Sequence, residues 1–167
     1  MNSVVTGMEE ISGYPDTARV WIYQGSRPVA PEVRDDVKRV LRDFARQWTS
    51  HNQQLRAHGD LLYDRFVVLV ADESQAGASG CSIDTSVRFI RELGEQLNID
   101  FMDRLQFAYL TSGGSVATVH KDELPELYRS GEVTDETLVF DNLVNTRAGL
   151  ERSWLIPLAD SWMKRFV

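Results

Sequence analysis

The sequence predicts an α+β fold built in the order strand, helix, strand, strand, helix, strand. Three observations predict it: an amphipathic segment over residues 31–48, a second over residues 83–98, and short apolar segments around them. This order matches the split β-α-β motif of ferredoxin-like folds, in which two helices cover one face of an antiparallel or mixed sheet. We expect this core over residues 17–114, an irregular lead-in over residues 1–16, and a small carboxy-terminal α/β extension over residues 115–167 packed on the core.

The first helix is predicted to start at Pro31. Proline suits the first helical position because its missing N–H would have no partner there. Asp35 and Asp36 follow near the positive end of the helix dipole. The apolar positions recur at helical spacing, and they are Val33, Val37, Val40, Leu41, Phe44 and Trp48. We therefore expect one buried stripe and one solvated face.

Four segments predict the strands of the core sheet. Residues 19–24 are rich in β-branched and aromatic side chains and end at a Gly-Ser-Arg-Pro turn. Residues 60–64 and 66–70 follow the first helix, and the second of these is a continuous apolar run that suits a central buried strand. Residues 105–110 alternate partly, so we expect them to supply the fourth strand.

The last third of the chain predicts a short helix over residues 122–129 and a strand over residues 137–140. Beyond them, Trp154, Trp162 and Phe166 carry too much apolar area to stay in water. Two interpretations stay open. These side chains pack on their own domain, or they form an interface with a protein partner or with a second copy of the chain in a homodimer.

Composition excludes several classes of protein. The chain has 167 residues, of which 43% are hydrophobic and 26% are charged, as in ordinary globular proteins. Eighteen Lys and Arg against 25 Asp and Glu give a net charge of −7, and this acidic field disfavours a nucleic-acid partner. Neither a basic, apolar leader nor a run of about 18 apolar residues occurs, so we expect a cytoplasmic protein without membrane contact.

The single cysteine, Cys81, excludes an intramolecular disulfide and a Cys/His zinc pattern. It follows a loop of small residues at the predicted start of the second helix, where unpaired N–H groups and the helix dipole favour a thiolate. One hypothesis is therefore a cysteine-dependent enzyme or redox sensor, with His51, His58 or His120 as the activating base. The alternative is an inert cysteine beside a helix cap made by Ser82.

The same loop suggests a small-anion or nucleotide binder. Gly77, Ser79, Gly80 and Ser82 would let backbone amides approach a phosphate or carboxylate closely. Plain turn chemistry before a helix is the alternative interpretation. His51 and His58 lack the short spacing of metal ligands, so we expect no metal and no other cofactor.

Residues 16–23 (DTARVWIY), 77–84 (GASGCSID) and 161–166 (SWMKRF) carry a resemblance. With them, nearly the whole chain resembles an uncharacterised bacterial family of similar length whose members are often labelled ABC transporter ATPase. The resemblance implies a bacterial cytoplasmic protein.

The ATPase label has no support in the residues. A P-loop requires GxxxxGK[ST], whereas residues 77–82 contain no lysine. The motifs HExxH, GxSxG, GxGxxG and CxxC do not occur either. The leading hypothesis is a soluble binding or accessory module without catalytic activity.

Overall fold

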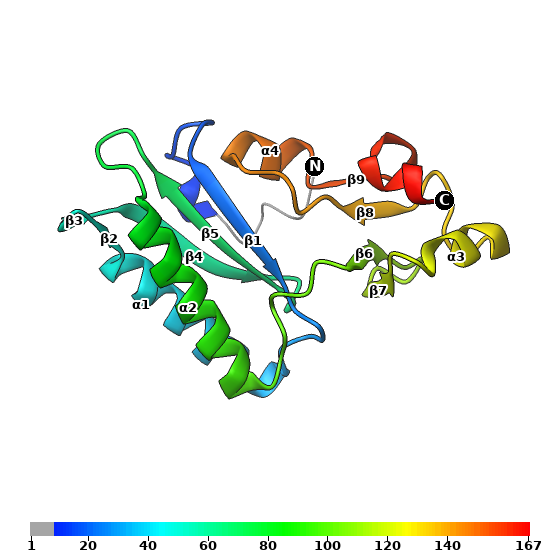
Figure 1. Cartoon of the computed structure of the whole chain (residues 1–167), viewed down its shortest axis with the longest axis horizontal. Helices are drawn as coiled ribbons and strands as arrows, with labels where there is room; N and C mark the ends of the chain where they lie inside the picture. Colours follow the sequence, from blue (N-terminus) through cyan, green and yellow to red (C-terminus); the bar gives the residue numbers. More distant parts are fainter. Residues whose placement is uncertain (1–8) are drawn as a thin grey trace.

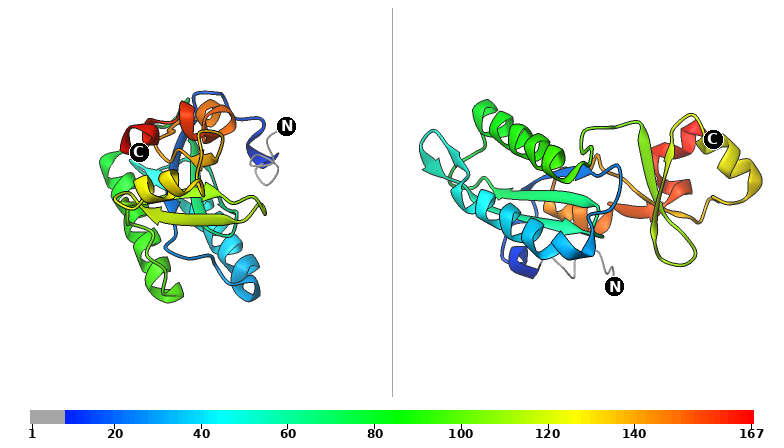
Figure 2. Two further views of the ribbon diagram at one scale, coloured as in Figure 1. Left: turned by 90° about the vertical axis from the view of Figure 1, so that its right-hand side faces the viewer. Right: turned by 90° about the horizontal axis from the view of Figure 1, so that it is seen from below.

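The computed structural model describes residues 9–167 and places two antiparallel sheets side by side along the longest axis of the molecule (Figures 1 and 2). The first sheet has the strand order β1-β5-β4, with β1 at Arg19–Gln24, β4 at Arg56–Leu62 and β5 at Phe66–Asp72. Helices α1 (Arg34–Gln47) and α2 (Gly80–Leu97) cover one face of this sheet. A short hairpin, β2 (Thr49–Ser50) and β3 (Gln53–Gln54), follows α1.

The second sheet is formed by the last third of the chain together with one strand from the predicted core. Its order is β7-β6-β8-β9. The strands are β6 (Gln106–Leu110), β7 (Val116–His120), β8 (Leu138–Phe140) and β9 (Leu155–Pro157). Helix α3 (Leu124–Ser130) and a 3-10 turn at Trp162–Phe166 pack on this sheet, and helix α4 (Arg147–Arg152) lies against β1.

The α+β class is confirmed, but the ferredoxin-like strand order is not found. Strand β6 pairs with β7 and β8 instead of completing the first sheet beside β1. The start of that edge of β1 is occupied by the extension: Val20 N–H donates to Asn145 O over 3.0 Å, and Arg147 N–H donates to Ala18 O over 2.8 Å. The expected boundary after residue 114 therefore falls inside the second sheet.

Strand β5 is central and every one of its residues is buried, as its continuous apolar run predicts. The turn before it lacks an Asn-Gly or Asp-Gly signal. Tyr63 and Asp64 instead adopt left-handed backbone angles with φ of 54° and 56°. Asp64 is held there because both of its carboxylate oxygens accept hydrogen bonds from Arg34, over 2.6 and 2.5 Å.

The two helices begin at different residues from those predicted. Pro31–Val33 forms a 3-10 turn, and α1 starts only at Arg34. Helix α2 starts at Gly80 rather than Ile83, because the Ser79 hydroxyl accepts a hydrogen bond from Ser82 N–H over 3.1 Å and caps the helix. The buried stripe of α1 contains Val37, Leu41 and Ala45.

The face of the first sheet opposite the helices is covered by the extension and by the described part of the lead-in. Phe66 packs on Phe140 and Trp154, with ring centroids 4.6 and 5.0 Å apart. Ile11 and Tyr14 are buried in the same cluster. A 3-10 turn at Glu9–Ile11 starts this segment, while residues 1–8 of the predicted lead-in lie outside the described residues.

Two glycines provide a matched test of this packing. A Cβ at Gly59 would lie 2.8 Å from the Leu41 carbonyl oxygen, whereas a Cβ at Gly80 meets nothing within 4 Å. Gly59→Ala is expected to lower the free energy of unfolding by about 1–3 kcal/mol, because backbone must move. Gly80→Ala is expected to raise it by about 0.4–1 kcal/mol by restricting the unfolded chain. Urea unfolding measures both, and equal effects would contradict the close approach of β4 and α1.

Candidate functional site

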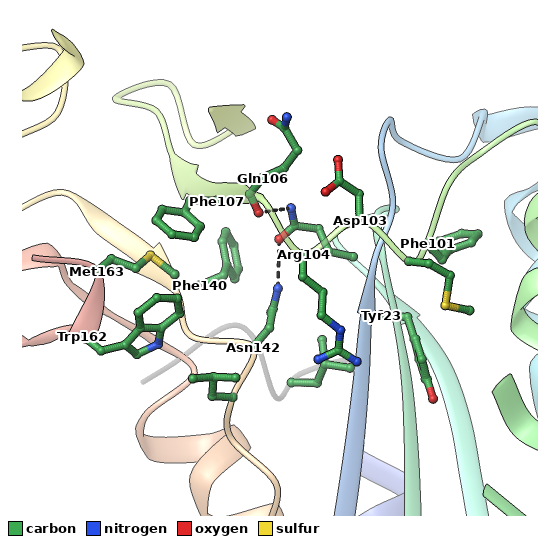
Figure 3. Close-up of a pocket in the computed structure, with 14 residues that line it drawn as sticks. Tyr23, Phe101, Asp103, Arg104, Gln106, Phe107, Phe140, Asn142, Trp162 and Met163 are labelled. Carbon is green, nitrogen blue, oxygen red and sulfur yellow. Dashed lines mark hydrogen bonds between the residues drawn. The ribbon is translucent and has the colours of Figure 1, made fainter. Parts of the chain in front are cut away.

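A cavity of about 110 Å³ opens where the two sheets meet (Figure 3). Its walls come from β1, from the segment before β6, from the segment after β8, and from the carboxy-terminal 3-10 turn. Phe107, Phe140 and Trp162 provide its aromatic surface. The cavity therefore forms because β6 pairs in the second sheet instead of beside β1, while the extension packs back against the first sheet.

A chain of side-chain hydrogen bonds crosses from one sheet to the other along the cavity wall (Figure 3). Trp154 Nε1 donates to Asn142 Oδ1 over 2.9 Å, and Asn142 Nδ2 donates to Gln24 Oε1 over 2.9 Å. Gln24 Nε2 then donates to the backbone oxygen of Gln106 over 3.0 Å. Because each group is buried or half-buried, these bonds fix the orientation of both amides.

Arg104 is the cation of the site. Its side chain extends into the space between Tyr23 and Asn142 (Figure 3). Among residues 9–167 no carboxylate pairs with it and no hydrogen bond involves its guanidinium, whereas Arg34 and Arg56 each bind an aspartate. Its neighbour Asp103 points the other way and accepts a hydrogen bond from Leu105 N–H over 2.9 Å. The cavity mouth therefore carries an uncompensated positive charge.

The surroundings of Arg104 are otherwise apolar. Leu143 lines the cavity and is 62% exposed, and Met102, which also lines it, is half-buried. Burial raises the pKa of Tyr23, while a hydrogen bond from Ser86 and the positive charge of Arg104 act in the opposite direction. An apolar hollow with a guanidinium at its mouth suits a ligand that is partly apolar and partly anionic.

Cys81 lies in the first turn of α2 and is exposed. Its backbone oxygen accepts a hydrogen bond from the Thr85 hydroxyl over 2.9 Å. Within the described chain no hydrogen bond joins Cys81 to a histidine. His51 lies in the turn between β2 and β3, and His120 Nδ1 accepts from Asp122 N–H over 3.2 Å. The structure thus provides no base in contact with the thiol, and the cysteine hypothesis stays a prediction.

The loop of residues 77–82 uses several of its polar groups internally. The Glu73 carboxylate accepts a hydrogen bond from Ala78 N–H over 2.7 Å, and it would lie 3.3 Å from a Cβ added at Gly77. Ser79 caps α2, and the Ser82 hydroxyl donates to Thr49 O over 2.7 Å. An external anion would have to compete with the Glu73 carboxylate, so this loop gives the anion hypothesis little support.

The three aromatic residues of the tail occupy different environments. Trp154 has no exposed surface and belongs to the core between the sheets. Trp162 and Phe166 are half-buried and contact Phe107 edge-on, with ring centroids 5.3 and 5.5 Å apart. Of the three, only Trp162 lines the cavity.

No group of three or more His, Cys, Asp or Glu side chains between residues 9 and 167 is arranged to hold a metal ion. In the same part of the chain no helix has the length and apolar character needed to cross a bilayer. No protein-family model matches the chain, and no curated protein or solved structure matches it either.

No sequence signal marks the main residues of this site, which are Arg104, Gln24, Asn142 and Leu143. Gln24 and Asn142 are 118 positions apart, and Gln24 and Gln106 are 82 apart. Only the unpredicted pairing of β6 and the return of the extension bring them together.

His58 provides a pH test. Its Nε2 is buried and has no hydrogen-bond partner among residues 9–167, and the Glu10 carboxylate lies 3.9 Å away. Burial lowers the pKa of His58 below its ordinary value of 6.5, with Arg42 and Lys38 acting in the same direction and Glu10 and Asp60 opposing. The folded state therefore binds fewer protons than the unfolded state, so this contribution to stability is complete above pH 6.5 and falls as the pH drops through 6.5.

We expect the wild-type protein to lose more unfolding free energy than His58→Gln between about pH 7 and pH 5, as measured by urea unfolding at each pH. Identical losses in the two proteins would contradict the lowered pKa.

Asn142→Ala tests the hydrogen bonds between the sheets. The substitution leaves Trp154 Nε1 and Gln24 Oε1 without their partners. The free energy of unfolding should fall by about 1–3 kcal/mol, since unsatisfied buried polar groups are costly. Thermal unfolding measures it, with Gln75→Ala in the exposed loop between β5 and α2 as the control.

Proposed function

We propose that this protein is a cytoplasmic binding or accessory module without catalytic activity, and that its ligand inserts one small apolar group into the cavity between the sheets. The observation that carries the proposal is the hollow lined by Phe107, Phe140 and Trp162, with Arg104, which has no ion-pair partner among the described residues, at its mouth. Ligand sites are typically concave, mostly apolar and equipped with few polar groups.

The size of the cavity limits what it accepts. Its volume is about 110 Å³, whereas an apolar cavity of roughly 150 Å³ holds benzene. A branched aliphatic group or a small ring therefore suits it, and a whole nucleotide does not. This size supports a side-chain-sized anchor and gives the nucleotide hypothesis no support at this site.

The polar groups around the cavity support binding more than catalysis. Gln24 and Asn142 are amides held in hydrogen bonds, and Arg104 is a permanent cation. Covalent catalysis requires a nucleophile activated by an adjacent base. Neither amide nor guanidinium supplies such a pair, whereas all three are suited to orienting a ligand.

The exposed side chain of Leu143 at the mouth supports the proposal that a partner covers the cavity. A side chain as large as Leu143 that stands 62% exposed beside a cavity adds apolar area that a ligand would remove from water. The sequence suggested a partner interface at Trp154, Trp162 and Phe166. We propose that the interface lies at the cavity instead, and that Trp162 is the one of these three residues that belongs to it.

The first experiment is a titration with isobutanol, a neutral probe with one branched aliphatic group, followed by amide chemical shifts in ¹H–¹⁵N spectra. The expected result is shift changes confined to residues around Trp162, Asn142 and Arg104. Leu143→Asp is expected to weaken isobutanol binding, because it replaces apolar area at the mouth with a charge. Val40→Asp is the control, since Val40 is also exposed and lies on α1. No isobutanol binding, or equal loss in both variants, would contradict the proposed site.

A further inference from the structure

We infer that the cavity and the adjacent edge of β1 form a receptor for the carboxy-terminal residue of a peptide. The terminal apolar side chain enters the cavity, its α-carboxylate pairs with Arg104, and the preceding backbone pairs at Ile22. This inference rests on the proposed function and names the chemical class of the ligand.

The first step is the unpaired charge. Arg104 forms no ion pair with any described residue, although the chain is acidic. Asp103, the other charged residue that lines the cavity, points away from it. A guanidinium presents donors in a planar fork that binds a carboxylate through two hydrogen bonds. A single carboxylate at the mouth would therefore complete the coordination of Arg104.

The second step is the open backbone at β1. Residues of an antiparallel strand alternate in the side to which their backbone N–H and C=O groups point. Val20 N–H points away from β5, because it donates to Asn145 O. Ile22, two residues further, therefore points its backbone groups to the same side as Val20, and Ile22 is also one of the residues that line the cavity.

No hydrogen bond from another part of the described chain reaches the Ile22 backbone on that side. The extension pairs with the backbone of this edge at its start, around Arg19 and Thr146, and it reaches the end of β1 through the side chain of Asn142, which donates to Gln24 Oε1. An extended peptide can add to such an edge by main-chain hydrogen bonds. The open stretch is short, so only the last residues of a peptide fit beside it.

The third step is the proximity of the apolar and anionic features. The cavity holds one side-chain-sized group, and Arg104 reaches into the space directly at its mouth. The apolar group and the carboxylate must therefore come from neighbouring atoms of the ligand. A carboxy-terminal leucine carries both on a single Cα, which an internal residue does not.

The charge of the protein favours the same class. A net charge of −7 repels a strongly acidic partner at long range. One terminal carboxylate facing one arginine is compatible with that field, whereas an acidic tract is not.

The experiment compares two probes, acetyl-Ala-Ala-Leu as the free acid and the same peptide as the carboxamide. Dissociation constants come from amide chemical shifts. The free acid is expected to bind roughly 10-fold more tightly, because hydrogen bonds to a charged partner contribute more than neutral ones. Arg104→Gln should reduce the affinity for the acid to that for the carboxamide and leave the carboxamide unchanged. Equal affinities of the two peptides for the wild-type protein would overturn the inference.

Arg88→Gln is the control, because Arg88 is exposed on α2 and its loss changes the net charge by the same amount. Equal losses in Arg88→Gln and Arg104→Gln would indicate a long-range charge effect and overturn the role of Arg104. The isobutanol titration separates the two proposals. Isobutanol binding without a preference for the acid overturns this inference alone, whereas no binding of isobutanol or of either peptide overturns the proposed function as well.

N-acetylleucine separates a peptide from a small carboxylic acid. It has the same side chain and carboxylate but lacks the two preceding alanines. The tripeptide acid should bind about fivefold more tightly if main-chain pairing at Ile22 adds a hydrogen bond. Equal affinities would overturn the peptide assignment and identify a site for small carboxylic acids.

Discussion

The structure depends on the contact between the aromatic rings of Phe66, Phe140 and Trp154. Phe66 belongs to the central strand of the first sheet, Phe140 to β8 of the second sheet, and Trp154 directly precedes β9. All three side chains are excluded from solvent, so their burial ties the two sheets together. This contact also fixes Asn142, which follows Phe140 by two positions and receives the hydrogen bond from Trp154.

The site is a consequence of how the sheets join. Residues 145–147 occupy the start of the free edge of β1, and β6 pairs in the second sheet. The end of β1 is therefore bordered by side chains instead of a neighbouring strand. Gln24 and Asn142 connect the two sides, and a hollow remains between them and the aromatic residues of the second sheet. Arg104, on the segment that enters β6, has its charge at the mouth of this hollow.

Local chemistry predicted much of the secondary structure. The apolar stripe of α1 and the continuous run of β5 both depend on residues close together in sequence. Sequence patterns did not predict two local features. The start of α2 at Gly80 depends on the cap by Ser79, and the turn at Tyr63 and Asp64 depends on the ion pair of Asp64 with Arg34. The pairing of β6 was wrong in the prediction, since its alternating pattern suits the edge of either sheet.

The sequence by itself determined the α+β class, because hydrophobic periodicity and turn residues act over a few positions. It also identified Cys81, residues 77–82 and the tail aromatics as chemically distinctive, without placing any base beside the thiol or any partner beside the tail. Only the tertiary structure decided that Trp154 is core and that Arg104 lies at a cavity without an ion-pair partner in the described part of the chain. Contacts such as Gln24 with Asn142 join residues 118 positions apart, and no local pattern encodes which distant segment will fill the edge of a strand.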